Sequence, residues 1–260
     1  MGIYFMENNY RPLRLATYNI HGGWGMDKVL DLNRIASVIK NMQVDFIAVN
    51  EIDCNCGRSE FADQPAVLAE LLQMNHHFAP ALEMRSERFP EQGSEVGLYG
   101  VAFYTPHQVS EIRQFMLPGL PEMEPRTAVI ARVDAPQMSF YAVVTHFCWE
   151  PKYEQFRVAS VEAINAEVAQ VRRQHPDEPV FLLGDLNAEP YSAPIEELRK
   201  NYVIANEGNF QATHPSDAPR EIIDYIMFAR QSTLRWKKVE IIPELVASDH
   251  RPLLAELEWM

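Results

Sequence analysis

The amino-acid sequence predicts an α/β fold, on three observations. Residues 13–51 and 139–185 each show the order strand, helix, strand. The expected strands are largely apolar, which is typical of parallel strands covered on both faces. Of the 260 residues, 47% are hydrophobic, which is enough for one substantial core or at most two small domains.

The first unit begins with LRLATYN (13–19), which alternates and favours a strand. Apolar residues then recur at helical spacing over 27–42. The segment VDFIAVNE (44–51) is again an apolar strand. A crossover between parallel strands is right-handed in nearly all proteins, so we expect these two strands to be parallel neighbours.

The second unit repeats this plan. The segment SFYAVVTHF (139–147) predicts a strand, residues 151–175 carry an apolar stripe at helical spacing, and PVFLLGD (179–185) predicts the next strand. Further strands are expected over 97–106, 126–134, 221–229, 235–242 and 251–259, with a helix over 64–74 and polar loops over 83–97 and 206–221. Neither loop has the length or composition of a linker, so residues 1–260 are expected to form a single domain.

Charge and composition restrict the function. The formal net charge is −13, whereas proteins that grip nucleic acid without sequence preference present a basic face. Nucleic acid is therefore a possible but disfavoured partner. No apolar run is long enough for a transmembrane segment. Residues 1–10 lack a signal-peptide pattern, so we expect a cytoplasmic protein, or an exported one if a leader is cleaved from a longer precursor. We also expect a monomer.

The three cysteines are Cys54, Cys56 and Cys148. An odd number cannot pair fully, which fits a reducing compartment. Cys54 and Cys56 are too close together for an ordinary disulfide, and their spacing is not that of a zinc finger.

Polar side chains occur where the expected strands end. Asn19 and Glu51 close the strands of the first unit, and His146 and Asp185 close those of the second, with Asn187 two residues further. Ligands of parallel sheets bind beyond the carboxyl ends of the strands. Each residue alone is as well explained by a turn, a helix cap or a polar core position. Their joint pattern indicates a site.

Three more residues extend this pattern. Asp224 lies inside the apolar segment IIDYIM, where a carboxylate is costly unless it is paired. A histidine is a suitable partner, and the pair would fix the tautomer of the ring. Asp249 and His250 precede the strand expected over 251–259. If that strand is antiparallel to its neighbour, these side chains reach the same edge.

These residue types suit metal-assisted phosphate chemistry. Mg²⁺ takes oxygen ligands, often only one or two carboxylates, and Glu51 is the best single candidate. Hydrolysis of a phosphate ester needs an activated water and donors to the phosphoryl oxygens. Asp185 can accept the proton of that water while Asn187 orients it, and His146 and His250 can donate to the phosphoryl oxygens.

Six motifs resemble, in order, those of the endonuclease/exonuclease/phosphatase superfamily. They are TYNIHGG, VNEID, VVTHF, LLGDLNAEP, IDYIMF and SDHRPLLAEL. The resemblance extends from Leu13 to Leu257, and the segment after Glu51 is most similar to small bacterial metal-dependent hydrolases. It implies a four-layer α/β sandwich, with two mixed β-sheets packed face to face and helices on the outer faces. It also implies a phosphoesterase that uses Mg²⁺ or Mn²⁺.

The resemblance implies a metal corner made by Asn19 and Glu51, with Glu51 as the direct ligand and Asp249 near the metal. The remaining roles concern the phosphoryl group. His146 and Asn187 map to phosphate contact, Asp185 to activation of the attacking water, and Asp224 to the partner of His250.

The chain also departs from the superfamily pattern. Val101 stands where many relatives have Asn, which leaves a substrate-side contact in question. Asn50 replaces a more usual Gln before the metal-binding Glu. Arg126 matches an arginine that is common in small members, and Arg58 can also reach the site, so both are candidate substrate-binding residues.

The leading hypothesis is a phosphoesterase that hydrolyses a phosphodiester bond or, as the other possibility, a phosphomonoester bond. The expected substrate is a small phosphodiester, a lipid headgroup or a sugar phosphate. A nuclease acting on DNA or RNA is the first alternative. A non-catalytic binding module on the same fold is a second, motivated by Val101. A cysteine or zinc hydrolase built on His146 and Cys148 is a third.

Overall fold

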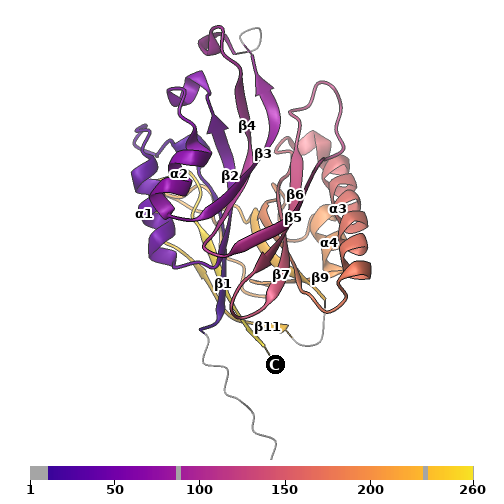
Figure 1. Cartoon of the computed structure of the whole chain (residues 1–260). Coiled ribbons are helices and arrows are strands. Elements are labelled where there is room, and N and C mark those ends of the chain that lie inside the picture. The colour runs from indigo at the N-terminus through magenta and orange to yellow at the C-terminus, as the bar shows by residue number, and fades with distance from the viewer. Residues whose placement is uncertain (1–10, 86–88, 231–233, 260) are drawn as a thin grey trace, which may run out of the picture.

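The computed structural model describes residues 11–85, 89–230 and 234–259. Within these residues, twelve strands form two mixed sheets that pack face to face, with helices on both outer faces (Figure 1). The expected four-layer α/β sandwich is confirmed. Residues 1–10, on which the expectation about a leader rests, lie outside the described ranges. None of the helices in the described ranges has both the length and the apolar composition needed to span a membrane.

The first sheet has a parallel pair at its centre. β1 pairs with β2 in parallel, and all other neighbours in this sheet are antiparallel. Its order is β11 (Leu234–Ile241), β12 (Leu253–Trp259), β1 (Leu13–Asn19), β2 (Phe46–Cys54), β4 (Gly97–Thr105) and β3 (Asn75–Met84). Helices α1 (Leu32–Met42) and α2 (Gln64–Leu72) cover its outer face (Figure 1).

The second sheet repeats this arrangement. β7 pairs with β8 in parallel, and the remaining pairs are antiparallel. Its order is β5 (Gln108–Met116), β6 (Thr127–Asp134), β7 (Ser139–His146), β8 (Val180–Asp185), β10 (Asp224–Ala229) and β9 (Tyr202–Ile204). Helices α3 (Glu154–Gln174) and α4 (Ala193–Arg199) cover the other outer face. Short 3₁₀ helices occupy His21–Gly23, Gly57–Ser59, Pro90–Gln92 and Pro151–Tyr153.

The core between the sheets is built from large aromatic side chains. The Phe46 and Phe103 rings stack at 5.2 Å, and Phe140 lies edge-on to both Phe46 and Phe181. Two further apolar layers lie under the helices. Because every central strand is covered on both faces, these strands read as continuous apolar runs in the sequence.

The two strand–helix–strand units are confirmed, but the first helix begins later than expected. The chain forms a bridge between Trp24 and Leu30. The Asp31 side chain then accepts a hydrogen bond from the Arg34 amide at 3.1 Å, which caps the helix. The helix therefore starts at Leu32 rather than at residue 27.

Four elements are absent from the sequence-based expectation. They are β3, β5, β9 and α4. β3 and β5 are edge strands, and most side chains of β5 are exposed, so its sequence lacks the apolar pattern of a strand. β9 has three residues and α4 has seven, which is too short for periodicity to be recognised.

Gly184 sits where β8 runs beside β7. Its φ is 149°, and a Cβ at this position would lie 1.9 Å from the Thr145 carbonyl oxygen. The close approach of the two backbones therefore requires glycine. It leads the chain directly into Asp185 at the end of the strand.

We predict that Gly184→Ala lowers the free energy of unfolding by about 2–4 kcal/mol, because the added methyl group collides with the Thr145 backbone of the neighbouring strand β7. Gly208→Ala is the matched control. Its φ is also positive, at 79°, but an added Cβ meets no atom within 4 Å, so it should cost only about 1–2 kcal/mol. Urea denaturation of both variants measures the difference, and equal losses would contradict the steric argument.

Candidate active site

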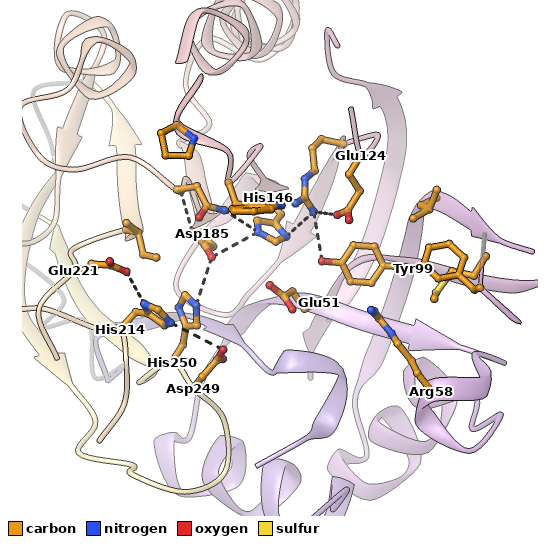
Figure 2. A pocket seen from close by; sticks show the side chains of 18 residues that line it. Glu51, Arg58, Tyr99, Glu124, His146, Asp185, His214, Glu221, Asp249 and His250 are labelled. Atoms are coloured by element: carbon orange, nitrogen blue, oxygen red, sulfur yellow. Dashed lines mark hydrogen bonds and ion pairs between the residues drawn. The ribbon is translucent and has the colours of Figure 1, made fainter. Parts of the chain in front are cut away.

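Eight of the predicted site residues come together at one end of the two sheets. They are Asn19, Glu51, His146, Asp185, Asn187, Asp224, Asp249 and His250. Figure 2 labels five of them: Glu51, His146, Asp185, Asp249 and His250. The topology explains this convergence. β1, β7 and β8 end here, while the antiparallel strands β10 and β12 begin here. β2 continues to Cys54, so Glu51 reaches the site from within the strand and not from its end, where the sequence predicts it.

Asn19 links a carboxylate of each sheet. Its Nδ2 donates to Glu51 Oε1 at 2.9 Å and to Asp185 Oδ2 at 3.1 Å. Its Oδ1 accepts from the His21 amide at 3.1 Å, which fixes the orientation of the carboxamide. Glu51 and Asp185 are thus held on either side of one amide group.

The side chain of Asn50 connects β2 of the first sheet to the backbone of the second sheet. Its Nδ2 donates to the Thr145 carbonyl at 2.8 Å, and its Oδ1 accepts from the Asp185 amide at 3.0 Å. The side chain is fully buried, so both of its hydrogen bonds replace contacts with water. The carboxamide at this position therefore has a structural role.

Glu51 adopts an unusual backbone conformation. Its φ is 57°, and the register of β2 against β4 shifts between Asn50 and Ile52. A bulge of this kind redirects a side chain, and a non-glycine residue at positive φ is strained. Here the bulge directs the Glu51 carboxylate into the cavity (Figure 2).

Asp224 and His250 form a buried ion pair. His250 Nδ1 lies 2.8 Å from Asp224 Oδ2, which also accepts from Thr213 Oγ1 at 2.6 Å. Burial alone would lower the pKa of His250, but Asp224 and then Asp185 outweigh it and raise that pKa to about 10. The ring is therefore cationic at neutral pH, with Nε2 3.7 Å from Asp185 Oδ2.

Asp185 is a buried carboxyl group with a displaced pKa. Burial raises its pKa, the charge of Asp224 acts in the same direction, and the value reaches about 7 although His250 opposes the shift. Asp185 Oδ1 accepts from the Asn187 amide at 2.9 Å. A carboxylate with this pKa is suited to accept a proton at neutral pH.

His146 and His250 differ in charge, because their pKa values are displaced in opposite directions. Burial, the positive charge of Arg126 and that of His250 all hold the pKa of His146 well below its usual value, so the ring is neutral. Its Nδ1 is 3.1 Å from Arg126 Nη1, and its Nε2 is 3.0 Å from Asn187 Nδ2. Asn187 Nδ2 also donates to the Phe147 carbonyl at 3.1 Å.

A cavity of about 570 Å³ is lined by six of the eight residues, namely Glu51, His146, Asp185, Asn187, Asp249 and His250. Its volume is within the usual range for small-molecule sites. Arg58 lies on its wall. The Arg58 guanidinium is held by Asp53 through two hydrogen bonds of 2.9 and 2.7 Å and lies over the Tyr99 ring. Trp149 also lines the cavity and is 61% exposed.

Two residues that the sequence analysis associates with substrate contact, Arg126 and Val101, are largely buried. Arg126 lines the cavity but is only 7% exposed, and it is paired with Glu124 at 2.9 Å. Val101 packs in the core between the sheets, opposite Asn50 in the register of β2 and β4. The departure at Val101 therefore changes the core rather than the cavity wall.

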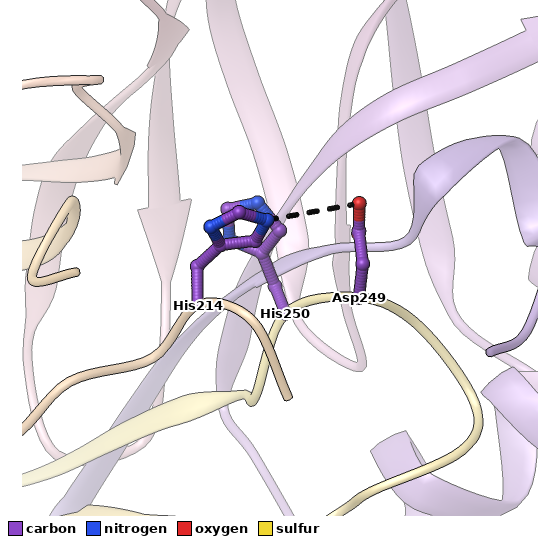
Figure 3. Close-up of side chains that lie close together, drawn as sticks. All are labelled: His214, Asp249 and His250. Atoms are coloured by element: carbon purple, nitrogen blue, oxygen red, sulfur yellow. Dashed lines mark ion pairs between the residues drawn. The ribbon is translucent and has the colours of Figure 1, made fainter. Parts of the chain in front are cut away.

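His214 lies in the site although the sequence gave no reason to select it (Figure 3). Its ring contacts that of His250, with centroids 4.6 Å apart and the ring planes tilted by 38°. Its Nδ1 is 2.6 Å from Glu221 Oε2, and its Nε2 is 4.0 Å from Asp249 Oδ2. His214 comes from a polar loop with no periodic pattern, so only the folded chain reveals its position.

The oxygen-rich side chains fit a hard divalent cation. Asn19, Glu51 and Asp249 offer carboxamide and carboxylate oxygens, which Mg²⁺ and Mn²⁺ prefer. Among the residues that the structure describes, no lysine or arginine lies within ion-pairing distance of Glu51 or Asp249; the nearest cationic candidate at Asp249 is His21, at 3.6 Å. Both carboxylates therefore remain available to a metal.

Two other clusters bring three ligating atoms within 4.8 Å of one another. In Asp185, Asp224 and His250 these groups already bind one another or the surrounding amides. His214, Asp249 and His250 form the second cluster (Figure 3), in which both rings are tied through Nδ1 to carboxylates. Because His250 is cationic, it is a poor ligand in this state.

The cysteines lie apart from this chemistry. Burial is the main cause that raises the pKa of the Cys54 thiol to about 11 and that of Cys56 to about 12. Cys148 lines a different cavity, beside Leu117 and Phe156. All three are free thiols, and none lines the cavity of the candidate active site among its described lining residues.

The sequence and the fold identify the family. The profile of the Endonuclease/Exonuclease/phosphatase family matches residues 16–250, so the chain belongs to this family. Its members generally hydrolyse phosphate esters and commonly use divalent metals.

Individual relatives are more distant. A probable RNA exonuclease of Schizosaccharomyces pombe is 36% identical over 71 residues, which is 26% of this chain and only 14% of that protein. The structure of an endonuclease/exonuclease/phosphatase from Bacteroides vulgatus is 22% identical in sequence, with a TM-score of 0.73. The match covers 96% of this chain and 100% of that one. A mannosyl-6-phosphatase from Bacteroides thetaiotaomicron is 16% identical with a TM-score of 0.75, covering 95% and 99%. These two structures share the fold.

We predict that Asp224→Asn lowers the pKa of His250 from about 10 toward or below its ordinary value, because burial then outweighs the remaining negative charge. A raised histidine pKa stabilises the fold fully below about pH 6.5, and this contribution declines as pH rises toward 10. The variant should therefore lose about 3–5 kcal/mol below about pH 6.5 and progressively less at higher pH.

Histidine NMR titration and urea denaturation at several pH values measure these two effects. Asp217→Asn is the matched control, because Asp217 is exposed in the loop that precedes β10. A variant in which His250 still titrates near 10 would contradict the assignment of Asp224 as its partner.

Proposed function

We propose that this protein is a divalent-metal-dependent phosphoesterase that hydrolyses its substrate with an activated water. The main support is that Asp185, whose pKa is about 7, lies next to the cationic imidazole of His250 in one cavity. Environments that displace the pKa values of neighbouring groups in a cleft are typical of sites that move protons.

Glu51 would hold the metal as a direct ligand, with Asn19 and Asp249 completing the protein side of the site. The hydrogen bond from Asn19 to Glu51 supports this arrangement, because it orients the carboxylate as outer groups orient metal ligands. When bound, Mg²⁺ or Mn²⁺ would supply positive charge to the phosphoryl oxygens.

The chain's own groups divide the remaining work. Asp185 accepts the proton of the attacking water, and Asn187 orients that water or the phosphoryl group beside it. His250 presents its Nε2 side to the developing negative charge, while Asp224 preserves its protonated state. His146 donates to a phosphoryl oxygen as a neutral group. Arg58, which Asp53 holds on the cavity wall, would contact the rest of the substrate.

The substrate that fits best is a small phosphodiester, a lipid headgroup or a sugar phosphate. The net charge of −13 disfavours a long polyanion, and the cavity of about 570 Å³ suits a small molecule. The mannosyl-6-phosphatase of the same fold is consistent with a phosphomonoester of a sugar. We further propose that the chain acts as a single-domain monomer in a reducing compartment such as the cytoplasm, in keeping with its free thiols.

A nuclease is the second candidate. The local similarity to a probable RNA exonuclease favours it. Screening phosphomonoesters, phosphodiesters, phospholipids, RNA and DNA with Mg²⁺ and with Mn²⁺ separates these options. Hydrolysis of none of them in either metal would overturn the proposal in favour of a binding module.

We predict that Asp185→Asn and His250→Ala each lower turnover of bis-p-nitrophenyl phosphate by roughly 10²–10⁴, since each removes a proton-transfer or charge-stabilising group. Circular dichroism checks that both variants fold. Cys148→Ser is the control and should retain activity, because Cys148 lies outside the cavity. Full activity in both site variants, or loss on Cys148→Ser, would refute these roles.

We predict that Glu51→Gln weakens Mn²⁺ binding by about 10–100-fold, because an amide oxygen is a poorer ligand than a carboxylate. Calorimetric titration of the protein with Mn²⁺ measures this without substrate. Glu60→Gln, an exposed position after the 3₁₀ helix Gly57–Ser59, should bind Mn²⁺ as the unaltered protein does. Equal affinities in all three proteins would exclude Glu51 as a ligand.

A further inference from the structure

The contact between Arg126 and His146 fixes where the imidazole proton lies. Arg126 Nη1 is 3.1 Å from His146 Nδ1. A guanidinium in a protein is always protonated and can only donate. Asn187 Nδ2, which is also a donor, lies 3.0 Å from His146 Nε2, and a neutral imidazole can accept at only one of its two nitrogens. The charged guanidinium is the stronger donor, so Nδ1 accepts its hydrogen bond and carries no proton. A neutral imidazole has one N–H, so the proton lies on Nε2.

Arg126 is held firmly in this position. Its side chain is 7% exposed and is paired with Glu124 Oε1 at 2.9 Å. Tyr99 Oη lies 3.4 Å from the same nitrogen, and the Tyr99 ring is 5.9 Å from the guanidinium carbon (Figure 2). With a carboxylate, a hydroxyl and an imidazole around it, the guanidinium faces the interior of the protein.

The other side of the His146 ring faces the reacting groups. Its Nε2 is 3.6 Å from Asp185 Oδ2 and 3.0 Å from Asn187 Nδ2. Asn187 Nδ2 is a donor because it also donates to the Phe147 carbonyl. The positive charge of His250 opposes a second proton on His146. With the proton on Nε2, the 3.0 Å contact between His146 and Asn187 is between two donors and is not a hydrogen bond. An acceptor oxygen that binds both N–H groups would relieve this contact.

We infer that Arg126 is a positioning residue that holds His146 as the neutral tautomer with its proton on Nε2. In this state His146 donates a hydrogen bond into the cavity and takes no part in proton transfer. That the accepting atom is a phosphoryl oxygen rests on the function proposed above. The tautomer itself follows from the contacts of the resting protein and can be tested separately.

Nitrogen-15 NMR of histidine-labelled protein without substrate tests the tautomer, with His146→Asn used to assign the resonance. We expect His146 Nδ1 to be unprotonated and Nε2 protonated throughout about pH 5.5 to 9. In Arg126→Met the ring should exchange between tautomers and become protonated within this range. Glu124→Gln is the matched control, because it leaves the guanidinium in place and should keep the tautomer.

A proton on Nδ1 in the unaltered protein, or ordinary titration of His146 there, would overturn the inference. This measurement is decisive even if Arg126→Met fails to fold. It also stands if no phosphoesterase activity is found, so failure of the proposed function and failure of this inference can be told apart.

A double-mutant cycle tests whether Arg126 acts through His146. With bis-p-nitrophenyl phosphate, Arg126→Met should lower kcat about tenfold, but by less than about twofold when His146→Ala is already present. The ratio of Arg126→Met to unaltered activity should rise toward acidic pH, because protonation restores the Nε2 donor. Equal losses in both backgrounds, with a ratio independent of pH, would mean that Arg126 contacts the substrate directly and would overturn the inference.

Discussion

The geometry of the site depends on two buried carboxamides that join the sheets at one end. Asn50 bonds to the backbone of β7 and β8, and Asn19 connects Glu51 of one sheet to Asp185 of the other. Carboxamides can donate and accept at once, which suits a position between two backbones and between two carboxylates. Without these links, the apolar core alone would allow the sheets to slide, since burial of apolar surface is not directional.

Burial of charge is the second constraint. Asp185, Asp224, His146 and His250 are each at most 5% exposed, so each charge needs a partner or must be neutralised. Asp224 keeps His250 charged, and together with burial it raises the pKa of Asp185. Arg126 and burial keep His146 neutral. One small region therefore holds a base, a cation and a neutral donor, which are distinguished only by their neighbours.

The central part of this arrangement could be predicted from the sequence. Two apolar strand–helix–strand units place their strand ends together, and a carboxylate inside the apolar segment around Asp224 demands a partner. Of the four edge strands, only β11 is expected from the sequence; β3 and β5 lack periodic burial, and β9 is too short to show a pattern. His214 and the contact from Arg126 to His146 were missed for another reason. Both depend on how distant segments pack, and neither leaves a mark in the local sequence.

The claim that Glu51 is the centre of a metal site remains the main proposal of this account. Anomalous diffraction from a crystal soaked in Mn²⁺ tests it most directly. If Glu51 is a direct ligand, a peak lies within about 2.3 Å of one of its carboxylate oxygens. A peak between His214 and Asp249 instead, with none at Glu51, would contradict it.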